Sequence, residues 1–139
     1  MSYVKYVINF QDSGVNLIIA VGHSGYEVDK RIAREVADVD LVVGGHSHSF
    51  LFTGDPPSND IPLGPYPTLV KQNSGRTVPV VQAFWGTKYL GHIKLNFTKH
   101  GGLKSWAGAP ILLDSNYERG KTRINTVCIS TLKIRKISY

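Results

Sequence analysis

Two apolar segments that each run into glycine and then histidine constrain the fold of this chain most strongly. They occupy residues 17–23 and 41–48, and their first histidines are His23 and His46. Both segments begin with runs of valine, isoleucine and leucine, which are typical of strands buried on both faces. The pattern therefore predicts two buried strands, each of which presents an imidazole where it ends.

The stretch between these strands, residues 24–40, predicts an amphipathic helix. Ser24 is followed three residues later by Glu27, which is a capping-box pattern. Asp29 adds negative charge in the first turn, where it suits the helix dipole. Apolar residues recur at a spacing of four and charged residues cover the other face. The expected apolar face consists of Val28, Ile32 and Val36, with Ala33 and Ala37 beside them.

A strand, a helix and a second strand of these lengths form a βαβ unit, whose strands are parallel and whose crossover is right-handed. His23 and His46 are therefore expected at the same edge of the sheet, about 5 Å apart on neighbouring strands. His48 points to the same side if the chain is extended. Strand-end imidazoles with neighbouring glycines predict a metal site; a lone histidine there is more often a hydrogen-bonding loop residue. His92 and His100 lack this setting, and we expect them to be structural or exposed.

Longer motifs resemble the second half of the catalytic domain of the 5′-nucleotidases, within the calcineurin-like metallophosphoesterases. The resemblance covers residues 1–117 and is strongest to the animal ecto-5′-nucleotidase and salivary apyrase group. It implies an α/β fold, namely the C-terminal half of an αββα sandwich, with a βαβ unit followed by a mostly antiparallel meander. The motifs that carry it are GHSG (22–25), VVGGHSHSFL (42–51), TGDPP (53–57), VPVVQA (78–83), KYLG (88–91) and APILL (109–113).

This resemblance implies a dinuclear centre of two divalent metal ions, usually zinc, that hydrolyses nucleoside 5′-phosphates such as AMP. By motif, His23 and His46 resemble ligands of one metal. His48 resembles a ligand of the other, at a position where some members have asparagine. Neutral imidazole suits zinc, and Ser24 and Ser47 are expected to be supporting or turn groups. Full-length relatives are typically secreted or held at the cell surface.

The chain also departs from the family pattern. Family members carry an Asp-x-His motif, a bridging aspartate and a Gly-Asn-His-Glu motif upstream of the matched segment, and this sequence contains no Asp-x-His and no Asn-His pair. We therefore expect no catalytic residue here, an incomplete metal site and little or no phosphohydrolase activity from the isolated chain. The alternative is a non-catalytic product that acts as a binding or regulatory module.

The remainder of the matched segment predicts a long loop and then strands. Residues 52–67 are rich in proline and glycine and cannot form regular structure. Strands are expected at 66–72, 78–84, 89–97 and 103–113. Because this would be half of a sandwich, we expect exposed apolar surface, and hence aggregation or dependence on a partner chain.

Basic residues are distributed unevenly along the chain. The net charge is +6, yet residues 1–117 hold ten Lys/Arg against nine Asp/Glu, whereas 118–139 hold six against one. We therefore interpret 1–117 as a partial domain and 118–139 as a basic tail of doubtful origin. No aromatic residues are interleaved with the basic ones, so nucleic-acid binding is not expected. Membrane adsorption of the tail is the functional alternative.

Targeting signals are sparse in the sequence. No run of about 20 apolar residues predicts a transmembrane helix. Met1–Phe10 lacks the pattern of a signal peptide. Cys128 is the single cysteine, so no internal disulfide can form. Asn96-Phe97-Thr98 is an N-glycosylation sequon, which matters only if the chain is secreted.

Overall fold

The computed structural model of this protein describes residues 14–117. The predictions for the tail 118–139, for Met1–Phe10 and for Cys128 lie outside the described residues. Within them the chain forms one α-helix and eight short strands. These are β1 (Ile19–Val21), α2 (Tyr26–Glu35), β2 (Leu41–Val43), β3 (Thr68–Lys71), β4 (Thr77–Val81), β5 (Tyr89–Leu90), β6 (Lys94–Phe97), β7 (Leu103–Ala107) and β8 (Ile111–Leu112).

The predicted βαβ unit is present. β1 pairs in parallel with β2, with Ile19 opposite Leu41, and α2 forms the crossover between them. The main sheet has the order β1-β2-β4-β3, in which β4 is parallel to β2 and β3 is antiparallel to β4. The carboxyl ends of β1, β2 and β4 therefore meet at one edge of the sheet, which is where ligand sites of parallel sheets form.

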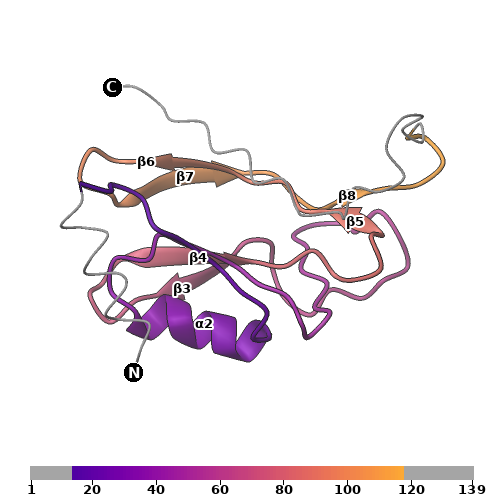
Figure 1. Cartoon of the computed structure of the whole chain (residues 1–139). Helices are drawn as coiled ribbons and strands as arrows, with labels where there is room; N and C mark the ends of the chain where they lie inside the picture. Colours follow the sequence, from indigo (N-terminus) through magenta and orange to yellow (C-terminus); the bar gives the residue numbers. More distant parts are fainter. Residues whose placement is uncertain (1–13, 118–139) are drawn as a thin grey trace.

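The molecule is layered around this sheet. Figure 1 shows α2 on one side of β3 and β4 and the β6–β7 hairpin on the other. Ile93 and Leu95, at the start of the hairpin, pack against the buried core. The α/β class and the antiparallel strands after the βαβ unit agree with the fold predicted from the sequence.

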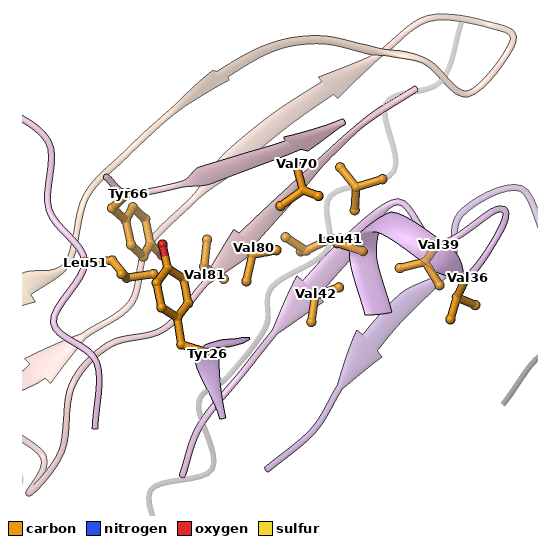
Figure 2. Packing of buried hydrophobic residues seen from close by; sticks show 12 residues of the cluster. Tyr26, Val36, Val39, Leu41, Val42, Leu51, Tyr66, Val70, Val80 and Val81 are labelled. Atoms are coloured by element: carbon orange, nitrogen blue, oxygen red, sulfur yellow. The ribbon is translucent and has the colours of Figure 1, made fainter. Parts of the chain in front are cut away.

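Valines dominate the core, which lies mainly between α2 and the sheet. Figure 2 shows Val80 and Val81 of β4 near the aromatic rings of Tyr26 and Tyr66, with Val42 of β2 farther along the same cluster. All five side chains are buried. Full burial of one such aliphatic side chain stabilises a fold by about 1.5–3 kcal/mol, so a small set of valines holds α2 to the sheet.

β1 is more exposed than the sequence predicted. Leu41 and Val42 of β2 are buried, as expected, but Val21 of β1 is 73% exposed. β1 lies at the end of the strand order, and within residues 14–117 no other strand pairs with its outer edge. The expectation that both strands are covered on both faces is therefore wrong for β1.

The two long strands predicted at 89–97 and 103–113 are each broken. β5 pairs with β8 and β6 pairs with β7, which gives two small antiparallel sheets instead of one continuous ladder. His92 lies in the break between β5 and β6, and Gly108 lies in the break between β7 and β8. The two breaks are neighbours, since a Cβ on Gly108 would lie only 2.4 Å from the carbonyl oxygen of His92. Gly108 also has a φ of +123°, which ladder geometry does not allow. His92 and His100 are exposed, as expected.

The helix begins differently from the predicted capping box. Gly25 is the N-cap residue and makes no side-chain cap, while the Ser24 hydroxyl donates to Oδ1 of Asp29 over 2.6 Å. The buried face is centred on Asp29 and Ala33, both 0% exposed, whereas Val28 is only half-buried. Ala33 and Val36 are buried as predicted and Ile32 packs against the core, but the first turns bury Asp29 more deeply than Val28, and Ala37 is exposed.

Candidate metal centre

The first two histidines meet where the sequence predicted them. His23 follows β1 and His46 follows β2, and their ring centroids lie 5.2 Å apart with an interplanar angle of 69°. Both residues are exposed. Neighbouring parallel strands bring the two imidazoles together at one edge of the sheet, which confirms the predicted separation of about 5 Å.

His46 sits in a tight turn with an unusual backbone. The carbonyl of Gly45 accepts the N–H of Ser47 over 2.9 Å, and the central residue His46 has a φ of 72°. His48 is also left-handed, with a φ of 49°. Left-handed backbone at a residue other than glycine costs on the order of 1–3 kcal/mol. Contacts from the surrounding structure must therefore hold this loop in place.

Gln82 supplies the main support for the turn. This residue follows β4 and is 3% exposed. Its Oε1 accepts the N–H of Ser49 over 2.5 Å, and its Nε2 donates to the carbonyl of Gly45 over 3.1 Å. One buried amide side chain thus bridges both sides of the His46 turn and fixes the direction in which the imidazole leaves the backbone.

Ser47 connects the same turn to the helix. Its hydroxyl oxygen accepts the N–H of Tyr26, in the first turn of α2, over 2.9 Å, and lies 2.8 Å from the hydroxyl of Ser49. The first N–H groups of a helix have no partner within it, so Ser47 satisfies one of them. This geometry agrees with the predicted supporting role of Ser47 and explains why Ser24 is not needed as a cap.

Asp29 lies behind the turn, fully buried. Burial raises the pKa of its carboxyl group, while hydrogen bonds from Ser24 and Gln82 and the charge of His23 act in the opposite direction. Among the described residues, Oδ2 finds no hydrogen-bond partner. A Cβ on Gly44 would lie 1.9 Å from this oxygen, so the carboxylate occupies the space that the glycine leaves free.

The second glycine of the pair makes room for an imidazole. A Cβ on Gly45 would lie 3.0 Å from Nδ1 of His23. Gly44 therefore accommodates Asp29 and Gly45 accommodates His23. Local packing thus explains the glycine pair before His46.

His48 does not join the other two imidazoles. Its ring stacks on the indole of Trp85, with centroids 5.6 Å apart and an interplanar angle of 18°. In the part of the chain that the structure describes, no three His, Cys, Asp or Glu side chains come close enough to hold a metal ion. His23 and His46 supply two nitrogen donors, half of the four ligands that a structural zinc takes. Within residues 14–117 the donor set fits zinc in kind and provides two of these ligands.

Sequence reasoning missed three residues of this site. Gln82 could have been found, because it follows the apolar run before it in the same way that the histidines follow theirs. Asp29 was expected only as a negative charge in the first helical turn, and the sequence did not indicate that it is fully buried. Trp85 carries no signal in the sequence that connects it with His48.

The chain is similar to known 5′-nucleotidases. It is 56% identical to human 5′-nucleotidase over 102 residues, which are 73% of this chain and 18% of that protein. It is 46% identical to snake venom 5′-nucleotidase of Macrovipera lebetinus over 126 residues, 91% of this chain and 30% of the relative. No protein-family model matches the chain.

A solved structure of a 5′-nucleotidase is also similar to this chain. The crystal structure of a 5′-nucleotidase precursor from Thermus thermophilus matches with a TM-score of 0.74 and 39% identity. The match covers 80% of this chain and 22% of that one. The chain therefore spans less than a third of the length of each of these relatives.

Proposed function

Since this chain belongs to the 5′-nucleotidase family, we propose that it is part of a metal-dependent hydrolase that cleaves nucleoside 5′-phosphates into nucleoside and phosphate. The observation that carries the proposal is the pairing of His23 and His46 at the carboxyl ends of neighbouring parallel strands. Exposed imidazoles on a supported turn are suited to bind a divalent cation.

The proposed centre contains two divalent metal ions, with zinc as the expected metal. His23 and His46 would hold one ion, and His48 would contribute to the other. Such ions act as Lewis acids on phosphate oxygens. The residues of this chain supply binding and orientation: Gln82 holds the His46 turn on both sides, and Ser47 ties it to the first turn of α2.

The isolated chain is proposed to bind zinc weakly and to hydrolyse AMP slowly or not at all. Its described residues hold no third ligand beside His23 and His46, and it covers 18% of the human relative. We infer that a bridging carboxylate and a proton donor come from residues outside this sequence. A chain without those groups would act only as a binding module.

An extracellular location is part of the proposal. It is supported by relatives named as snake venom 5′-nucleotidases, which match this chain at 46% and 53% identity. In residues 14–117 no helix has the length and apolar character to cross a membrane. The nucleotide substrate is likewise inferred from the names of the relatives.

A chimaeric enzyme tests the proposed function. The aligned stretch of human 5′-nucleotidase is replaced by the corresponding residues of this chain, and AMP hydrolysis is measured with zinc present. We expect a folded, zinc-dependent hydrolase whose activity is abolished by His23→Ala or His46→Ala. The matched variant His92→Ala, at an exposed histidine away from the turn, should keep full activity.

Thermal unfolding and zinc content of the chimaera are measured first, so that misfolding is recognised. A folded chimaera that binds zinc but leaves AMP intact would overturn the enzymatic proposal and favour a binding module. Full activity in the His23→Ala and His46→Ala variants would overturn the assignment of these two residues.

A further inference from the structure

The sequon Asn96-Phe97-Thr98 lies on the β6–β7 hairpin and has no part in the candidate metal centre. It is the one Asn-x-Ser/Thr triplet of the sequence. Asn96 belongs to β6 and stands opposite Ser105 of β7. Thr98 opens the turn, where its hydroxyl oxygen accepts the N–H of Gly102 over 3.1 Å.

The two faces of this hairpin differ. Leu95 packs against the buried core. Side chains alternate along a strand, so Asn96 points to the opposite face, away from the core. There its Nδ2 donates to the hydroxyl of Ser105 over 2.8 Å, in an exposed hydrogen bond. Asn96 is half-buried, and the hydrogen bond of its amide nitrogen is an exposed one to a small polar neighbour.

Space is available around Asn96. The cross-strand neighbours on its face are Ser105 and Ala107, which are small and exposed. Lys94, two residues before Asn96, is exposed as well. A bulky group on Asn96 would extend into solvent without displacing a core side chain.

The hairpin turn is remote from the histidine pair. Arg76 donates to the carbonyl of Gly101 over 2.8 Å and also pairs with Asp40. Asp40 directly precedes β2, whereas His46 follows the other end of that strand. The turn after Asn96 therefore lies at the amino-terminal end of β2, and a group on Asn96 would leave the candidate metal centre open.

We propose that Asn96 is the acceptor of an N-linked glycan. The donor class is an oligosaccharide joined to a membrane lipid through pyrophosphate. The amide nitrogen of Asn96 forms a bond to the anomeric carbon of the sugar and releases one proton. The bond between that carbon and the pyrophosphate oxygen breaks, and the lipid pyrophosphate leaves with the electron pair. One N–H of the amide remains after the transfer.

Translation into microsomes tests this proposal. The chain is synthesised behind a cleavable signal peptide in the presence of endoplasmic-reticulum microsomes, and the protease-protected fraction is examined on a gel. We expect a protected band that migrates more slowly than the unmodified chain, because one glycan adds a bulky group to the asparagine. An amidase that removes N-glycans should return the band to the unmodified mass.

Variants identify the acceptor. Asn96→Gln and Thr98→Ala should abolish the shift, and Thr98→Ser should restore it, because serine also completes the sequon. The control Asn73→Gln, at an exposed asparagine outside any sequon, should shift like the wild type. A protected wild-type chain of unmodified mass would overturn the proposal, as would a shift that survives Asn96→Gln. Neither result depends on metal binding or nucleotide hydrolysis.

Discussion

The hydroxyl oxygen of Ser47 accepts the backbone N–H of Tyr26 over 2.9 Å, although the two residues are 21 positions apart. A helix N-terminus is more commonly capped by the residue directly before it. Here the cap comes from the turn that carries His46, so α2 and the turn stabilise each other. Anything that displaces the turn also uncovers a helix N–H group.

Replacement of Gln82 should loosen this turn. In Gln82→Ala, the N–H of Ser49 and the carbonyl of Gly45 lose their partners, and an unpaired buried polar group costs about 1–3 kcal/mol. We expect the free energy of unfolding to fall by about 2 kcal/mol and zinc affinity to fall with it. Chemical denaturation and zinc titration measure the two effects.

Gln72 provides a matched control for that variant. It is 5% exposed, and its Nε2 donates to the carbonyl of Val36 over 2.7 Å, just beyond the end of α2. Gln72→Ala should lose a similar amount of stability but leave zinc affinity unchanged. Equal loss of zinc affinity in both variants would mean that Gln82 acts only through global stability.

The glycines that end β1 and β2 should respond differently to alanine. A Cβ on Gly44 would lie 1.9 Å from Oδ2 of Asp29, whereas a Cβ on Gly22 would meet its nearest atom, the Ser24 hydroxyl oxygen, at 3.8 Å. We expect Gly44→Ala to cost about 1–3 kcal/mol through overpacking and Gly22→Ala to cost about 0.5 kcal/mol or less. Urea denaturation of both variants checks this, and similar losses would contradict it.

Zinc binding by the isolated chain should depend on the paired histidines. The ring centroids of His23 and His46 lie 5.2 Å apart. Removal of either side chain therefore leaves a single nitrogen donor. We expect His23→Ala and His46→Ala each to weaken zinc binding by about tenfold, equal to 1.4 kcal/mol. Calorimetric titration measures the affinity. His100→Ala should bind like the wild type, and equal weakening there would point to non-specific binding.

Protonation of Asp60 at low pH should weaken the contacts between the loop of residues 52–67 and β5. Oδ2 of Asp60 accepts hydrogen bonds from Lys88 over 2.5 Å and from Tyr89 and Ser58 over 2.6 and 2.7 Å. These contacts, that of Lys88 foremost, lower the pKa of Asp60 from 3.8 to about 2. Because the folded-state pKa is depressed, the contacts stabilise the fold above about pH 4.

This stability should disappear as the pH falls from about 4 to about 2. Asp60→Asn should remove that part of the pH dependence of unfolding, which denaturation at a series of pH values between about 2 and about 6 measures. The control Asp55→Asn changes an exposed aspartate of the same loop and should keep the wild-type profile. An unaltered profile in Asp60→Asn would show that the contacts of Asp60 do not stabilise the loop.

Much of the candidate site was predictable because its signals are local. An apolar run, a glycine and a histidine specify a strand end, and a helix-length segment between two such runs makes the strands parallel. These facts place His23 and His46 at one edge without further information. The resemblance of the motifs around them to 5′-nucleotidases also depends on the sequence alone.

Tertiary structure decided what depends on residues far apart in the chain. The cap of Tyr26 by Ser47, the stacking of His48 on Trp85 and the burial of Asp29 against Gly44 each join separate segments. The periodicity of apolar residues indicates which side of a helix or strand is apolar. It does not indicate which polar group from a distant part of the chain packs against that side. The carboxylate of Asp29 can therefore be buried on α2, because Gly44, directly after β2, leaves it room.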